Sequence, residues 1–226
     1  MTTLPHPNFA AIRDIVWDDT SSILDNSAPM FGSVLTERGL LDRLLDGVRA
    51  DAHLAALCER YDFLDKLVVY DDPESSVRLR LHLYRPGYFD RPHNHRWAFS
   101  SMIVSGSYRH LVYGDDERFD QQTDPESLRA VYERVERPGS HYALHHTSVH
   151  AVQAEADTIS LLLRGPATSD RFLILDREAG GSFWVYGAAR ESAEQRASKR
   201  MSATDIDQTV ARVREVLGAG SSALIS

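Results

Sequence analysis

Histidine, the side chain that most often binds transition metals in proteins, is concentrated in the middle of this sequence. Eight of the ten histidines lie between positions 82 and 150: His82, His93, His95, His110, His141, His145, His146 and His150. Two of them form a His93-x-His95 pair. On extended backbone, side chains two residues apart share a face and are separated by about 6.5 Å, so both imidazoles can bind one metal at about 2.1 Å. The pair therefore predicts a metal site.

A third ligand must come from elsewhere in the chain, and three histidines are candidates. His150 alternates with Val149 and Ala151, so it can face a barrel interior while these two face the other way. His145 and His146 are adjacent, so only one of them can point to the metal. All three stay alternatives at this point.

Polar residues also alternate along the segment before the pair. Arg78, Arg80 and His82 are separated by single apolar residues. They can line a pocket, but an exposed polar strand face is the more economical interpretation. Tyr84 and Trp97 are expected in the barrel core rather than as platforms for substrate.

The elements that must position these residues are short strands. The alternation from Val77 to Arg85 is typical of a strand with one buried face. Eight further strands are predicted at Ala98–Val104, Tyr108–Tyr113, Val131–Val135, Tyr142–His145, Val149–Ala154, Thr158–Arg164, Phe172–Leu175 and Phe183–Tyr186. Many short strands with frequent Gly and Pro turns favour a β-sandwich or barrel over alternating βα units.

Both ends of the chain are predicted to be helical. Apolar residues at three- and four-residue spacing indicate a helix around Val34 to Val48, and a second helix is predicted from about Asp51 to Leu64. Cys58 would then lie in a helix-packing seam, as a small buried hydrophobe rather than a reactive thiol. The Ser202-Ala-Thr-Asp205 spacing predicts the start of a C-terminal packing helix that ends at Gly218.

Composition limits the partners and the location. The 226-residue chain has a net charge of −8, which gives it no electrostatic reason to bind nucleic acid or anionic lipid. A single cysteine excludes an intramolecular disulfide. The first residues show no leader pattern, and the longest apolar stretches are far shorter than a membrane span. We therefore expect a cytoplasmic protein with no nucleic-acid or membrane partner, and a homodimer stays open.

The sequence around the pair resembles the cupin superfamily. Gly87, then five residues, then His93-x-His95 and an apolar stretch to Gly106 resemble the first cupin motif, and the segment after Pro138-Gly139 resembles the second. The register of that second motif favours His150 as the third ligand. The pattern Tyr84-Arg-Pro-Gly…Pro-His-x-His-Arg-x-Trp97 is most similar to bacterial thiol dioxygenases of the cysteine dioxygenase type. The likeness covers residues 84–166.

The resemblance implies a particular donor set. Most cupins place a glutamate four or five residues after the second histidine, where this chain has Phe99 and Ser100. The implied site is therefore all-histidine, formed by His93, His95 and His150. The likeness to thiol dioxygenases favours Fe(II), with Zn, Ni, Mn or Cu as alternatives, and implies a small-molecule substrate together with O₂.

The closing strand departs from that family. Where thiol dioxygenases carry Ser-x-His-x-Tyr, this chain has Ser160, Leu162 and Arg164. We predict that Ser160 and Arg164 serve the reaction, with Arg164 binding a substrate carboxylate through a two-pronged contact. A surface arginine paired with an acid is the alternative interpretation of Arg164. The departures predict a substrate larger or less polar than cysteine, and negligible oxidation of cysteine itself.

These observations predict an all-β core, a cupin (double-stranded β-helix, or jelly-roll) barrel at residues 67–188. Helical extensions are expected at residues 1–66 and 189–226. The predicted function is a mononuclear non-haem Fe(II) oxygenase, a dioxygenase acting on a small carboxylate-bearing metabolite. Two alternatives stay open: a metal-dependent isomerase, lyase or hydrolase on the same fold, and a non-enzymatic cupin that binds a small molecule or a metal.

Overall fold

Antiparallel sheets form the centre of the molecule in the computed structural model, which describes residues 4–87, 89–176, 181–187 and 190–222. Three sheets are present, with strand orders β1-β2-β3-β9-β4-β7, β6-β5-β8 and β10-β11. The strands are β1 (Glu59–Arg60), β2 (Leu64–Asp72), β3 (Val77–Tyr84), β4 (Phe99–Ser105), β5 (Tyr108–Asp115), β6 (Tyr132–Glu136), β7 (His141–Leu144), β8 (Ser148–Ala154), β9 (Ile159–Arg164), β10 (Arg171–Ile174) and β11 (Phe183–Tyr186). Each of the nine predicted strands is present within two residues of its predicted bounds.

The six-stranded sheet and the β6-β5-β8 sheet pack face to face. One apolar cluster joins Phe99, Ile103 and Leu162 of the larger sheet to Tyr108 and Val152 of the smaller sheet. Alternation along the strands sends every second side chain into this space. The candidate site lies in this space between the two sheets.

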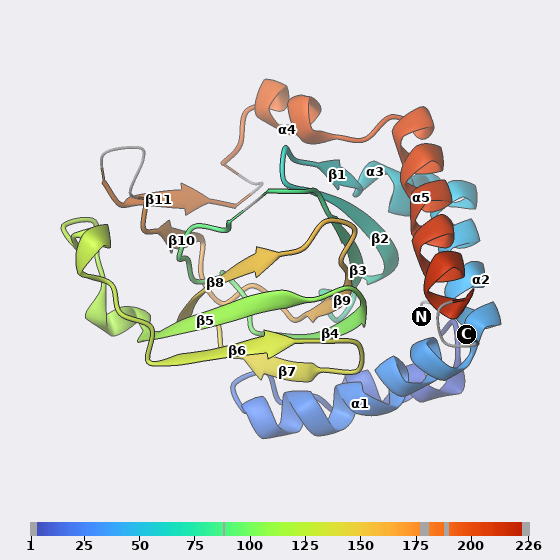
Figure 1. The fold of residues 1–226 in the computed structure, drawn as a ribbon, viewed down its shortest axis with the longest axis horizontal. Coiled ribbons are helices and arrows are strands. Elements are labelled where there is room, and N and C mark those ends of the chain that lie inside the picture. The colour runs from blue at the N-terminus through green and yellow to red at the C-terminus, as the bar shows by residue number, and fades with distance from the viewer. Residues whose placement is uncertain (1–3, 88, 177–180, 188–189, 223–226) are drawn as a thin grey trace.

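Helices cover the other face of the six-stranded sheet (Figure 1). They are α1 (Thr20–Thr36), α2 (Arg38–Ala50), α3 (Ala52–Ala56) and α5 (Ala203–Ser222), with the 3-10 helix η1 (Pro7–Asp14). The short helix α4 (Ala193–Lys199) precedes α5 and buries no residue, and the 3-10 helices η2 (Asp116–Arg118) and η3 (Pro125–Ser127) lie in the connection between β5 and β6. Helical side chains such as Phe31, Leu45 and Val213 share a cluster with Leu81 and Leu161 of the sheet. Both faces of the sheet are therefore covered. None of the helices in the described part of the chain combines the length and the hydropathy of a membrane-spanning segment.

The predicted helix from Asp51 to Leu64 is wrong. The side chain of Asp51 caps α3, but this helix ends at Ala56 and the chain then forms β1 and β2. Residues 64–72 are buried on both sides of the strand, apart from Lys66, so this segment lacks the alternation of a half-buried strand. Within the predicted helix, Glu59 and Arg60 form β1, and the pairing of β1 with β2 overrides the local helical pattern.

Cys58 lies after α3 rather than within a helix. Its side chain is fully buried in the cluster beneath the helices, where Sγ lies 3.3 Å from both Leu54 O and Val68 N. Burial raises the pKa of the thiol to about 11. The prediction of a small buried hydrophobe instead of a reactive thiol is confirmed.

The C-terminal helix α5 begins as predicted. Asp205 N donates to Ser202 Oγ, and Asp205 Oδ2 accepts from Ser202 N, so the pair forms a capping box with Asp in place of Glu. Ile206, Val210 and Val213 of the predicted stripe are buried. The predicted end at Gly218 is wrong, because α5 continues to Ser222.

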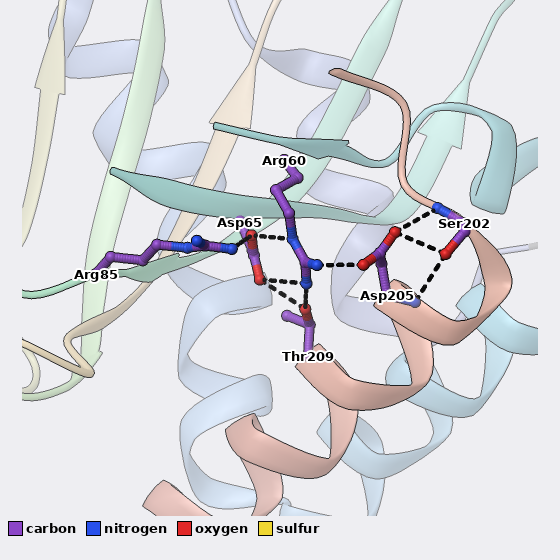
Figure 2. Close-up of polar contacts among 6 residues, drawn as sticks. All are labelled: Arg60, Asp65, Arg85, Ser202, Asp205 and Thr209. Atoms are coloured by element: carbon purple, nitrogen blue, oxygen red, sulfur yellow. Dashed lines mark hydrogen bonds and ion pairs between the residues drawn. The ribbon is translucent and has the colours of Figure 1, made fainter. Parts of the chain in front are cut away.

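A charged network ties α5 to the edge of the six-stranded sheet (Figure 2). Arg60 donates from Nε to Asp65 Oδ1 at 3.0 Å and also pairs with Asp205 of the helix. Thr209 Oγ1 donates to Asp65 Oδ2 at 2.7 Å, and Arg85 pairs with the same carboxylate at 3.1 Å. Although burial opposes ionisation, the hydrogen bonds from Arg60 and Thr209 hold the pKa of Asp65 below its usual value. The network fixes the position of the helix by complementary charge as well as by apolar contact.

The predicted fold class, an all-β jelly-roll core with helices before and after it, is confirmed by this arrangement. The division of the chain at residues 66 and 188 stays a prediction, and β2 crosses the first of these boundaries.

Candidate metal centre

Three histidines meet between the sheets. The imidazoles of His93, His95 and His150 each offer a nitrogen, and these three atoms lie within 4.8 Å of one another. The ring of His93 lies 4.6 Å from that of His95 and 4.9 Å from that of His150, measured between centroids. Nε2 of His95 faces Nε2 of His150 at 2.8 Å. The sequence-predicted triad is therefore brought together, in a group that could hold a metal ion.

The segment that carries the His-x-His pair is anchored at several points rather than being a regular strand. His93 forms an isolated β-bridge with His150, in which each backbone N–H donates to the other residue's carbonyl at 2.9 Å. Between the pair, the buried Asn94 donates to Asp116 Oδ2 at 2.6 Å and accepts from Leu173 N at 2.7 Å. These hydrogen bonds orient the Asn94 side chain away from the two imidazoles and fix the loop that carries His93 and His95.

Hydrogen bonds set which nitrogen each histidine presents. His93 Nδ1 donates to the carbonyl of Arg91 at 2.7 Å, which leaves its Nε2 as the lone-pair atom. His150 Nδ1 lies 3.1 Å from His110 Nε2, and His110 Nδ1 lies 3.1 Å from Glu136 Oε1. With an ionised Glu136, His110 donates to the carboxylate and accepts from His150 Nδ1–H, so His150 also presents Nε2.

Glu136 is held in its ionised form at the end of this chain. It is almost fully buried, and burial alone would raise its pKa, but hydrogen bonds from His110 and Arg134 lower the pKa below its usual value. A buried carboxylate oriented in this way fixes a histidine ligand through a neighbouring ring. Sequence reasoning missed this role of His110 and Glu136. Pairing of β5 with both β6 and β8 creates it, and the sequence carries no spacing signal for that pairing.

Two of the ligand imidazoles, those of His95 and His150, are held in the neutral form. Burial, and then the neighbouring histidines, lower the pKa of His150 well below its ordinary value. The pKa of His95 is lowered in the same direction by burial, by His93, and by the cations Lys66 and Arg80. Only the neutral imidazole has a lone pair free for a metal, so both rings are in the binding form at neutral pH.

Aromatic side chains pack around His95. Trp97 stacks on its ring with 4.7 Å between centroids and 23° between planes, and Phe99 meets it edge-on at 4.8 Å. Tyr84 is buried in the same cluster, as predicted, and Trp97 packs against it partly buried. These contacts hold His95 in one orientation and keep its surroundings apolar.

The other candidates for the third ligand lie outside the triad. His145 Nδ1 contacts Thr147 Oγ1 at 2.9 Å, and its Nε2 faces Asp18 at 3.9 Å. His146 meets the pair only through its backbone carbonyl, which accepts from His95 N. Within the described ranges, the metal-binding group contains no carboxylate, in keeping with Phe99 at the position of the usual cupin glutamate.

Ser160 and Arg164 lie on β9, on the face that looks toward the smaller sheet. Ser160 Oγ is buried and has no hydrogen-bond partner among the described residues. Arg164 Nη1 donates to the carbonyls of Ser76 and Gly165, whereas its Nε is buried without a partner. Burial, together with Arg80 and Arg78, lowers the pKa of Arg164 to about 9. The substrate-binding roles of Ser160 and Arg164 stay predictions.

The interpretation of Arg78, Arg80 and His82 as an exposed polar face is wrong. His82 is only 6% exposed, and Arg78 and Arg80 are partly buried. The leucines between them face the helices, so these three face the space between the sheets. Because both faces of this sheet are covered, polar residues that alternate along its strands cannot face solvent.

Comparisons with known proteins give likenesses at the level of structure only. No family profile and no curated protein matches the sequence. An RmlC-like cupin from Shewanella frigidimarina is 16% identical, with 50% of this chain and 86% of that chain covered and a TM-score of 0.38. KdgF from Halomonas sp. is 17% identical, with 48% and 86% covered and a TM-score of 0.37.

A third solved structure is described as a sugar phosphate isomerase of the cupin superfamily from Silicibacter pomeroyi. It is 15% identical, with 59% of this chain and 83% of that chain covered, and the TM-score is 0.33. The proteins that this chain is similar to therefore include cupins, one of them an isomerase. Because every one of these TM-scores lies below 0.5, conclusions about chemistry depend on the residues of this chain.

Proposed function

We propose that this chain is a cupin-type mononuclear metalloenzyme that binds Fe(II) through His93, His95 and His150 and oxidises a small carboxylate-bearing molecule with O₂. The observation that carries the proposal is the convergence of three imidazoles, with no carboxylate in the group among the described residues, and burial favours the neutral form of His95 and His150. Three neutral ligands leave a divalent ion its full charge and leave coordination positions open. Nitrogen donors suit iron, and Zn, Ni, Mn and Cu are the competing ions.

The residues around the triad support this function in separate ways. Bound Fe(II) would supply a cationic centre for an anionic substrate and a redox partner for O₂. His110 and Glu136 orient His150, and the Arg91 carbonyl orients His93. Trp97 and Phe99 limit the access of water to His95.

Oxygen uptake by the Fe(II)-loaded full chain tests the proposal. Purified protein is reconstituted with Fe(II) without oxygen, then mixed with air-saturated buffer and a panel of small carboxylates that includes cysteine. We expect substrate-dependent uptake with at least one carboxylate, negligible uptake with cysteine, and none in His93→Ala.

The same panel under anaerobic conditions identifies the competing chemistry. Product formation without O₂ would contradict oxidation and favour an isomerase, lyase or hydrolase in which the metal acts only as a Lewis acid. Absence of turnover in both conditions would contradict an enzymatic role for the centre.

A further inference from the structure

A second polar group lies beside the triad, on the inner face of the six-stranded sheet. It consists of Lys66 on β2, Arg80 and His82 on β3, and Ser160 on β9. Lys66 pairs with His82 in the strand register, and His82 pairs with Ser160, so these three lie side by side across three strands. Arg80 is two residues from His82 on the same strand, and so on the same face. We call this group the basic cluster.

Members of the basic cluster lack the partners that buried polar groups ordinarily have. In the described part of the chain, His82 Nε2 and Ser160 Oγ make no hydrogen bond, although the two residues are only 6% and 1% exposed. Lys66 Nζ lies 4.2 Å above the Tyr61 ring, and the Arg80 guanidinium lies 5.5 Å from the Trp97 ring. A buried polar atom without a hydrogen-bond partner destabilises the folded protein, so the cluster opposes folding unless a ligand supplies the missing partners.

The nearest acid does not neutralise the cluster. Glu59 lies opposite Lys66 in the register of β1 and β2, and although burial opposes its ionisation, the charges of Lys66, Arg80 and Lys199 together lower its pKa. Lys199 Nζ lies 3.1 Å from Glu59 Oε1, and Tyr61 OH donates to Oε2 at 3.1 Å. By contrast, Arg78 on the same strand and face pairs with Asp71 at 2.7 Å. One carboxylate is therefore shared among three cations, and among the described residues neither Lys66 nor Arg80 forms an ion pair with an acid, so the cluster keeps an excess of positive charge.

The basic cluster is continuous with the metal centre. Arg80 lies over Trp97, and Trp97 stacks on His95. A small molecule that binds the cluster is therefore a short distance from the triad, with one aromatic ring between the two positions.

We infer that Lys66, Arg80, His82 and Ser160 form a subsite for the oxyanion group, carboxylate or phosphate, of a small molecule whose other end reaches the histidine triad. This inference deepens the proposed function by placing substrate recognition in this cluster in addition to Arg164. The cations supply charge-assisted hydrogen bonds, and the imidazole and the hydroxyl supply the remaining donors.

Binding of simple anions to the metal-free full chain tests the subsite. The probes are butanoate, its neutral analogue butanamide, and inorganic phosphate, followed through the backbone amide shifts of β2, β3 and β9 by NMR. We expect butanoate or phosphate to bind about tenfold or more tightly than butanamide. The anion with the higher affinity, butanoate or phosphate, identifies the oxyanion group of the ligand as a carboxylate or a phosphate. Either result supports the subsite.

Matched variants show whether the charge acts through this cluster. Arg80→Gln and Lys66→Met should each weaken anion binding by about tenfold. Arg78→Gln, which removes an acid-paired arginine from the same strand and face, should change it by less than about twofold. Equal binding of butanamide, no anion binding at all, or an equal loss in Arg78→Gln would overturn the inference. Thermal melts of each variant establish that it is folded.

The anion-binding test of the subsite does not depend on whether the protein binds a metal. Anion binding is measured without metal, and the metal content of Lys66→Met is measured separately. A protein that binds anions but fails to bind Fe(II) would contradict the proposed function and keep the subsite. A protein that binds Fe(II) but no anion would keep the proposed function and overturn the subsite.

Discussion

Along β3 and β9, the two faces of the six-stranded sheet carry side chains of different kinds although the same strands build both. On the helix side, Leu79, Leu81, Leu161 and Leu163 are fully buried in one apolar cluster. On the inner side, the intervening positions hold Arg80, His82 and Ser160. Among the described residues, His82 Nε2 and Ser160 Oγ make no hydrogen bond, and the Arg80 guanidinium lies 5.5 Å from the Trp97 ring. Both faces are shielded from water, so exposure does not explain the difference.

Within one strand, the residues that face the helices stabilise the fold, whereas those that face the smaller sheet are candidates for ligand binding. Apolar burial on the helix side contributes roughly 1.5–3 kcal/mol for each fully buried leucine. The inner side reduces stability, because desolvated cations and orphaned donors oppose folding. Sites that bind ligands commonly carry such a cost in the free protein. The contrast leads to the following predictions.

The largest effect is expected from truncation on the helix side. Leu161→Ala should lower the free energy of unfolding by about 3 kcal/mol, because it leaves a cavity in a close-packed cluster. Leu162→Ala, one residue away on the inner face, should cost less, since its side chain is 7% exposed and belongs to the smaller apolar cluster between the sheets. Urea denaturation of both variants makes the comparison. An equal or larger loss for Leu162→Ala would remove the distinction between the faces.

A smaller effect is expected when the support of the triad is altered. His110→Gln should weaken metal affinity by about 10–100-fold, because it removes the ring that orients His150. His141→Gln serves as the matched control, since His141 contacts Ser27 at 3.1 Å and lies outside the triad. Competition with a chelator measures both affinities. Unchanged affinity in His110→Gln would show that the hydrogen-bond chain does not act on the metal.

The smallest effect is expected for Lys66→Met. This variant should raise the free energy of unfolding, whereas Leu161→Ala should lower it. Burial, reinforced by Arg80, lowers the pKa of Lys66 to about 8. A group whose pKa falls on folding destabilises the protein fully below the folded pKa, and the cost fades as pH rises toward the unfolded pKa. Lys66→Met should therefore stabilise the protein by about 1–2 kcal/mol at pH 7, and the gain should shrink between pH 8 and 10.

Lys199 provides the control for that prediction. Although burial opposes its charge, the carboxylates of Glu191 and Glu59 raise the pKa of Lys199 above its ordinary value. Lys199→Met should therefore destabilise the protein at pH 7. Denaturation midpoints across this pH range measure both variants, and a destabilised Lys66→Met would mean that its ammonium group is satisfied in the free protein.

Much of the fold and the triad could be predicted from the sequence because both depend on short-range patterns. Alternation identified β3 and the strands after it, and two-residue spacing identified His93 and His95. The placement of β2 could not be predicted, since a strand buried on both faces has no alternation, and pairing with β3 decided it. Its interruption between Val68 and Tyr70, where the register shifts, obscures the pattern further.

The support around the triad was missed for a different reason. His110 contacts His150 and Glu136 only because β5 pairs with β8 on one side and β6 on the other. Contacts between strands that are far apart in the sequence produce no characteristic spacing of residues from which they could be predicted. The alternating Arg80 and His82 were visible, but the sequence does not say that a second sheet covers their face.

Metal content is the most direct test of the account. Full-length protein purified without a histidine tag is reconstituted with Fe(II), freed of excess ion and analysed by mass spectrometry of the metal. The wild type should hold about one ion per chain, and the double variant His93→Ala/His95→Ala should hold almost none while its thermal melt remains cooperative. A folded double variant that retains one ion per chain would contradict the assignment of the histidine triad as the metal centre.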